Sequence, residues 1–149
     1  MKTILAPVDF STPSELVADT AAALAQVYAG RVILLHVVQP PMVTNDYGVG
    51  IDNLQEIIVM SEKTATKNLE KLRARLTQAG VPTEIVLHTG APIPHILKQA
   101  ADSQADFIVM GSHGHTALYD LLVGSTTHGI LRSAPCPVVV LPRRKAAAA

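Results

Sequence analysis

Short runs of aliphatic residues alternate along the chain with longer segments whose apolar positions recur every three or four residues. The short runs predict strands at residues 3–8, 31–38, 83–88, 106–110 and 136–141. The longer segments predict helices at residues 12–29, 54–76, 92–102 and 125–131. Between them, residues 39–53 are rich in proline and glycine and predict a loop. Strands that alternate with helices in this way pair in parallel through right-handed crossovers. The sequence therefore predicts an α/β fold with a five-stranded, mainly parallel, doubly wound sheet in the order 3-2-1-4-5.

Residues with strong capping preferences mark the ends of these predicted helices. Thr12 is expected as the N-cap of the first helix, with Pro13 at its first helical position. Gly30 is expected as the C-cap of the same helix, and Gly80 is expected to stop the second one. Ser125 is expected as the N-cap of the last helix.

Three glycines and a serine form the spacing G-x-x-G-x9-G-S directly after the fourth predicted strand; they are Gly111, Gly114, Gly124 and Ser125. Because glycine destabilises helices and strands, this spacing indicates positive φ angles, close contacts or main-chain N–H groups that face a ligand. The last glycine leads into a predicted helix, whose N-terminus offers free N–H donors and the positive end of the helix dipole to a phosphate. On spacing alone, a tight loop without a ligand is an equally good interpretation.

Residues at the end of the first predicted strand should lie opposite this glycine loop. Ligands of doubly wound sheets bind outside the carboxyl ends of the strands, where the strand order reverses, here between the first and fourth strands. Pro7, Asp9 and Ser11 lie at this end of the first strand, and Met110 and Gly111 end the fourth. Asp9 could accept hydrogen bonds from ribose hydroxyls or an adenine edge. The alternative is a turn or N-cap role for Asp9 at the start of the following helix.

Composition excludes several classes of function. The 149 residues hold equal numbers of basic and acidic side chains, twelve of each, so no net charge attracts nucleic acid or an anionic membrane. The absence of tryptophan and the scarcity of other aromatic residues argue against a surface that stacks single-stranded bases. The length predicts one domain, residues 1–142, followed by a disordered tail, residues 143–149.

The single cysteine and the hydropathy pattern bear on the compartment. Cys136 has no partner for an intramolecular disulfide, and we expect it to act as a small buried apolar residue. The first residues read as a strand and not as a signal peptide, and no apolar stretch reaches the length of about 18 residues that spans a bilayer. These patterns predict a cytoplasmic protein.

Over nearly its whole length the chain resembles the universal stress protein family. The segments that carry the likeness are ILAPVDFS at 4–11, LLHVV at 34–38, MGSHG at 110–114, LLVGS at 121–125 and APCPVVV at 134–140. Members of this family that bind ATP carry the signature G-x-x-G-x9-G-(S/T), which is complete here. The resemblance therefore implies the ATP-binding type and a three-layer sandwich that is Rossmann-like, of the adenine nucleotide alpha hydrolase-like kind.

The resemblance also implies how a nucleotide would lie. Pro7 and Asp9 would lie beside the adenosine, Val37 would contact the adenine through its main chain, and Met110 and Gly111 would bracket the ribose. The expected nucleotide-binding residues are Pro7, Asp9, Ser11, Val37, Met110, Gly111, Ser112, His113, Gly114, His115, Gly124, Ser125 and Thr126.

The chain departs from its relatives at His115, a position that is often arginine. Because histidine titrates near neutrality, this departure predicts tighter nucleotide binding at about pH 6 than at about pH 8. His113 and His115 also lie close in sequence to Asp120 and His128, but this spacing is a poor match to known zinc ligand sets. We expect Mg²⁺ or Mn²⁺ to be held through the phosphates instead, and His36 to be structural.

No catalytic residues are evident. The Walker A pattern and the protein kinase motifs are absent, so we expect at most slow ATP hydrolysis. Three hypotheses remain: an ATP-binding regulatory module of the stress response, a slow ATPase switch, and a nucleotide-independent dimeric interaction protein. Val138–Leu141 is expected to form an apolar edge strand, and the resemblance favours a homodimer through this edge.

Overall fold

A computed structural model describes residues 1–11, 13–41, 51–113 and 123–142, with only the main chain of residues 51 and 52. The strands are β1 (Thr3–Pro7), β2 (Arg31–Val38), β3 (Thr83–Thr89), β4 (Phe107–Gly111) and β5 (Val138–Leu141). The helices are α1 (Ser14–Val27), α2 (Ile51–Gln78), α3 (Pro92–Asp102) and α4 (Ser125–Ser133). The predicted tail, residues 143–149, lies outside the described residues.

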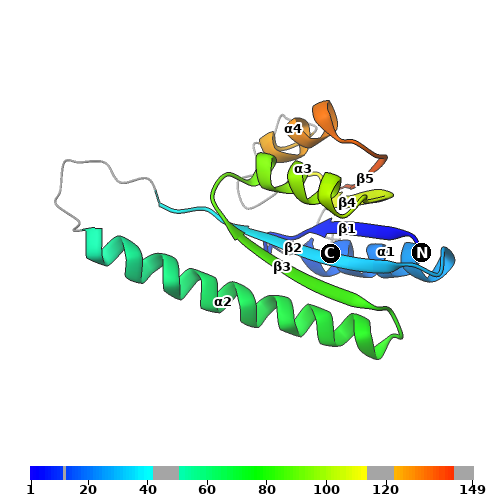
Figure 1. Cartoon of the computed structure of the whole chain (residues 1–149), viewed down its shortest axis with the longest axis horizontal. Coiled ribbons are helices and arrows are strands. Elements are labelled where there is room, and N and C mark those ends of the chain that lie inside the picture. The colour runs from blue at the N-terminus through cyan, green and yellow to red at the C-terminus, as the bar shows by residue number, and fades with distance from the viewer. Residues whose placement is uncertain (12, 42–50, 114–122, 143–149) are drawn as a thin grey trace, which may run out of the picture.

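All strands pair in parallel in the order β3-β2-β1-β4-β5, which confirms the predicted sheet. Helices α1 and α2 cover one face of the sheet and α3 and α4 cover the other, so the fold has three layers (Figure 1). Among the described residues, no helix combines the length and the apolar character that crossing a bilayer requires.

Successive side chains of the inner strands enter opposite cores. In β1, Ile4 and Ala6 pack on the α1 and α2 side, whereas Leu5 packs on the α3 and α4 side. In β2, Leu34 packs on the α1 and α2 side and Leu35 on the α3 and α4 side. All these side chains are fully buried. Burial on both faces explains why the predicted strands read as continuous apolar runs.

The predicted N-caps of two helices were wrong by one residue. The N–H of His128 donates to the carbonyl of Gly124 at 2.9 Å, so Gly124 is the N-cap of α4 and Ser125 is its first residue. Similarly, the N–H of Val17 donates to the carbonyl of Pro13 at 2.9 Å, so Pro13 is the N-cap of α1. Capping preference could not separate neighbouring candidates, because the hydrogen bond that begins a helix fixes its cap.

The predicted C-cap Gly30 has a different role. Ala29 adopts the left-handed conformation at the end of α1, with a φ of 50°, and the N–H of Gly30 closes the turn on the carbonyl of Ala25 at 2.7 Å. A β-carbon on Gly30 would lie 2.3 Å from the carbonyl oxygen of Lys2. Gly30 is therefore required by the close approach of β1 and not by its own φ angle. The predicted stop of α2 is confirmed, because Gly80 adopts a φ of 82° just after its end.

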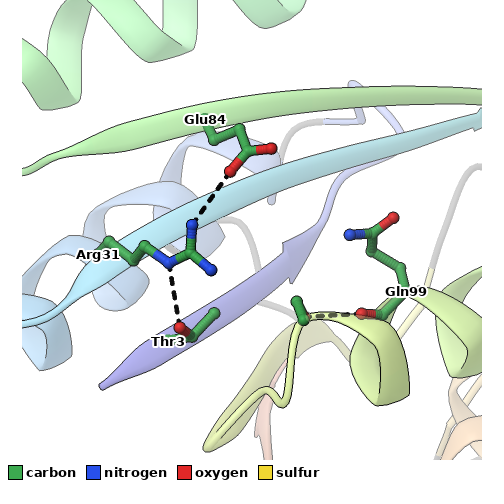
Figure 2. Close-up of polar contacts among 5 residues, drawn as sticks. Thr3, Arg31, Glu84 and Gln99 are labelled. Atoms are coloured by element: carbon green, nitrogen blue, oxygen red, sulfur yellow. Dashed lines mark hydrogen bonds and ion pairs between the residues drawn. The ribbon is translucent and has the colours of Figure 1, made fainter. Parts of the chain in front are cut away.

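Arg31, the first residue of β2, contacts the first residue of β1 and the second residue of β3. Its Nε donates to Oγ1 of Thr3 at 3.1 Å and its guanidinium contacts Oε2 of Glu84 at 3.2 Å, as Figure 2 shows. The exposed ion pair between Arg31 and Glu84 contributes little to the free energy of unfolding. They do place polar contacts across β1, β2 and β3 at the amino ends of these strands, opposite the carboxyl ends where ligands of this architecture bind.

Candidate functional site

A cleft of about 700 Å³ opens at the carboxyl ends of β1, β2 and β4. Its walls come from these strand ends, from the first turns of α1 and α4, and from the inner side of α2. Ten of the predicted site residues line it: Pro7, Asp9, Ser11, Val37, Met110, Gly111, His113, Gly124, Ser125 and Thr126. Of the other three, Gly114 and His115 lie outside the described residues.

Ser112 is the predicted site residue that does not line the cleft. It is buried, and its N–H donates to the carbonyl of Leu141 in β5 at 2.9 Å. Its carbonyl accepts the N–H of Gly124 at 2.6 Å, and its hydroxyl lies 3.1 Å from Nδ1 of His113. Ser112 thus fastens the end of β4 to β5 and to the start of α4. Ser112 therefore supports the cleft wall from behind and does not line the cleft.

Asp9 makes the turn contacts that the sequence left open, and its nucleoside role stays a prediction. Its Oδ1 accepts the N–H of Ser11 at 2.9 Å and also contacts the hydroxyls of Ser11 and, at 3.3 Å, Ser14. These contacts are those of a turn aspartate before a helix. The same residue lines the cleft, so the turn holds a carboxylate on the cleft wall.

The main chain of Val37 is directed toward the cleft. In β2, the N–H of Arg31 donates to the carbonyl of Lys2 at 2.8 Å. Four residues later, the carbonyl of Leu35 accepts the N–H of Val8 at 2.8 Å. Main-chain groups of a parallel strand alternate between its two neighbours, so the odd-numbered residues of β2 face β1. The β1 ladder ends at the pair Pro7 and Leu35, and Val37 therefore directs its N–H and carbonyl beyond the end of β1.

The N-terminus of α4 forms the opposite wall. Gly124, Ser125 and Thr126 line the cleft, and the first N–H groups of a helix have no acceptor within it. The hydroxyl of Thr127 donates to the carbonyl of Gly111 at 2.8 Å and holds this helix end against β4. Among the described lining residues there is no lysine or arginine. Main-chain N–H groups and the helix dipole are therefore the positive elements that this part of the wall offers to an anion.

The described glycines of the motif are not required by backbone conformation. Gly124 has a φ of −72°, and Gly111 is not among the residues with positive φ. A β-carbon on Gly111 would find its nearest neighbours at 3.6 Å, the carbonyl oxygen of His113, and at 3.7 Å, Cβ of Pro13. These are ordinary contact distances, so the described neighbours leave room for a β-carbon at position 111. Of the three reasons expected for these glycines, a positive φ does not apply to Gly111, and its described neighbours make no close contact.

The prediction missed several residues that line the cleft. Phe10, with a φ of 61°, and His36 lie on the side of α1 and α2. Thr64 and Asn68 of α2 face the same space. One signal was available for the last two, because they are polar residues next to the buried positions of an amphipathic helix. The conformation of Phe10 had no signal in the sequence.

The described residues do not assemble a metal centre made of protein ligands. No group of three or more histidine, cysteine, aspartate or glutamate side chains gathers in the described ranges. The zinc hypothesis also needed His115 and Asp120, which lie beyond these ranges. His88, on β3, stacks on His95 of α3 with ring centroids 4.8 Å apart, which is a packing contact.

A comparison with protein families matches residues 1–142 to the universal stress protein family. A universal stress protein of Methanocaldococcus jannaschii is 30% identical over 155 aligned positions, which cover 96% of each chain. Its solved structure superposes with a TM-score of 0.85 and covers 97% of this chain and 98% of that one.

Two less similar structures of this family were solved with nucleotides. One universal stress protein in complex with cAMP has 20% identity, a TM-score of 0.71 and coverage of 95% of this chain and 96% of its own. One from Archaeoglobus fulgidus in complex with dAMP has 22% identity, a TM-score of 0.66 and coverage of 94% and 97%. At these identities they establish the fold alone. The family model and the Methanocaldococcus relative span nearly the whole chain, which therefore belongs to the universal stress protein family.

Proposed function

We propose that the cleft binds an adenine nucleotide, with ATP as the preferred ligand, and that the protein is a nucleotide-dependent regulatory module of the stress response. The observation that carries this proposal is the position of Gly111 on the cleft wall. Neither the φ angle of Gly111 nor its described neighbours require a glycine there, and Gly111 shares the cleft wall with the N-terminus of α4 and the carboxylate of Asp9. The dAMP and cAMP complexes of related proteins support an adenine nucleotide as the ligand class.

The base and sugar would occupy the strand side of the cleft. The N–H and carbonyl of Val37 suit the edge of an adenine ring, which offers both an acceptor and a donor. Pro7 and Met110 supply apolar surface on either side, and Asp9 accepts hydrogen bonds from ribose hydroxyls. Gly111 lets the sugar approach the main chain closely.

The phosphates would lie at α4. Main-chain N–H groups of Ser125 and Thr126, their hydroxyls and the dipole of a nine-residue helix meet the negative charge. Gly114 and His115 complete the proposed loop. Mg²⁺ or Mn²⁺ would be held mainly by phosphate oxygens, as is usual for ions with few protein ligands.

A regulatory role suits the site better than rapid catalysis. Asp9 is the only carboxylate among the described lining residues, and its Oδ1 is engaged by Ser11 and Ser14. A general base for water needs access to the γ-phosphate, whereas Asp9 lies on the nucleoside side of the proposed ligand. We expect single-turnover assays to show hydrolysis that is much slower than nucleotide dissociation; turnover at ordinary enzyme rates would contradict a purely regulatory role.

The location of the ligand can be tested by amide NMR. Titration of the ¹⁵N-labelled protein with ATP should shift the amide signals of Val37, Gly111, Ser125 and Thr126. Signals at the opposite end of the sheet, such as those of Gly30 and Tyr28, should stay unchanged. Shifts confined to other regions, or no shifts at millimolar ATP, would reject the proposed site.

We further propose a homodimer through β5. This strand has β4 on one side and lies at the edge of the sheet. The carbonyl of Pro137 accepts the N–H of Ile108 in β4, and that of Leu141 accepts the N–H of Ser112 just after β4. By alternation, the N–H of Val140 therefore faces outward. Val140→Pro should therefore convert a dimer to a folded monomer in light scattering, whereas Val139→Pro should disturb the β4 pairing. A wild-type monomer at all concentrations would contradict the dimer.

A further inference from the structure

His36 contacts both residues that flank Asp9. Its Nδ1 lies 2.7 Å from the carbonyl oxygen of Val8, and its ring centroid lies 4.5 Å from that of Phe10, with 36° between the ring planes. A carbonyl oxygen only accepts hydrogen bonds, so Nδ1 carries the proton in this contact. One side chain therefore holds the main chain before Asp9 and the aromatic ring after it.

Phe10 adopts a conformation that is costly for a bulky residue. Its φ of 61° lies in the left-handed region, which a bulky residue other than glycine rarely adopts. This conformation turns the chain so that the N–H of Ser11 reaches back to Oδ1 of Asp9 at 2.9 Å. Contacts of the Phe10 ring with His36 and with the core on the α1 and α2 side offset this cost.

The imidazole of His36 contacts the main chain at the point where β1 stops pairing with β2. The N–H of Val8 still donates to Leu35, and the next bond of a parallel ladder would run from the N–H of Val37 to the carbonyl of Val8. Among the described main-chain bonds this one is absent, and the carbonyl of Val8 is contacted by His36 instead. The main chain of Val37 thereby stays directed at the cleft.

We infer that His36 is a positioning residue for the nucleoside: through Val8 and Phe10 it orients the carboxylate of Asp9 and leaves the main chain of Val37 for the base. This inference rests on the proposed nucleotide site. It concerns the nucleoside half of the ligand, because His36 contacts Val8 and Phe10, the two residues beside Asp9. Removing His36 should therefore weaken the binding of adenosine and of ATP by the same factor and leave the binding of tripolyphosphate unchanged.

Two variants separate the hydrogen bond from the ring. His36→Phe keeps an aromatic ring beside Phe10 but has no donor for the carbonyl of Val8. His36→Asn keeps a side-chain N–H at about the position of Nδ1 but has no ring. We expect His36→Phe to weaken adenosine and ATP binding tenfold or more, and His36→Asn to weaken it about threefold, with urea unfolding used to confirm that both are folded.

Coupling to Asp9 distinguishes positioning from general support of the fold. In wild type, Asp9→Asn should weaken adenosine binding. In the His36→Phe background the same substitution should have little further effect, because the carboxylate of Asp9 is then no longer oriented toward the nucleoside. Additive effects of the two substitutions, or wild-type adenosine affinity in a folded His36→Phe variant, would overturn the inference. If wild type binds neither adenosine nor ATP, the proposed function itself fails, and the inference fails with it.

Discussion

Substitution of Gly111 by alanine separates ligand binding from folding. The added β-carbon would lie 3.6 Å and 3.7 Å from its nearest described neighbours, which leave room for it. Since the φ angle is not positive, alanine should reduce the entropy of the unfolded chain and change the free energy of unfolding by less than about 1 kcal/mol. In the proposed complex, the same methyl group would occupy space that the sugar must enter. Overpacking of a tight contact costs about 1–3 kcal/mol, which corresponds to a roughly 5- to 150-fold loss of affinity.

Gly30→Ala is the matched control for this substitution. Its β-carbon would lie 2.3 Å from the carbonyl oxygen of Lys2, which belongs to the main chain and cannot rotate away. We expect this variant to lose about 1–3 kcal/mol of stability but to bind ATP as wild type does, since Gly30 lies at the opposite end of the sheet. Urea unfolding and calorimetric ATP titration of both variants provide the test. Normal ATP affinity in Gly111→Ala, or its failure to fold, would refute the reasoning about the motif.

Two further substitutions test the supports of the site and of the fold. Thr127→Val should leave the carbonyl of Gly111 without its 2.8 Å donor, destabilise the protein by about 1–2 kcal/mol in urea and weaken ATP binding; an unchanged affinity would show that this contact does not shape the wall. The N–H of Thr3, which donates to Oδ2 of Asp106 at 2.8 Å, lowers the pKa of that carboxyl group. Because the pKa of Asp106 is lower in the folded state than in the unfolded state, its carboxylate stabilises the protein above about pH 4. This stabilisation is lost as the pH falls further. Asp106→Asn should therefore flatten the acid limb of a plot of unfolding free energy against pH. An identical acid limb in the variant would contradict this assignment.

Periodicity was enough to predict the elements and their order. The apolar run of β2 and the helical spacing of Leu69, Leu72 and Leu76 both reflect burial, and burial dominates the choice of secondary structure. The convergence of Asp9 and Gly111 on one cleft followed from the topology of a doubly wound sheet. These features depend on patterns that extend over many residues.

Features that depend on a single hydrogen bond or dihedral angle were not predictable. Ser112 was expected in the site because it lies inside the motif. Its main-chain hydrogen bonds to Leu141 and Gly124 instead place it behind the cleft wall. The role of His36 depends on the left-handed conformation of Phe10, which no residue preference indicates. Local geometry of this kind is decided by tertiary contacts.

The most direct test of the account is a calorimetric titration of the wild-type protein with ATP, ADP and AMP. Phosphates at the N-terminus of α4 should each add favourable interactions, so affinity should rise from AMP through ADP to ATP. Equal affinity for the three nucleotides would contradict the phosphate site at α4. The absence of binding by all three would contradict the central claim.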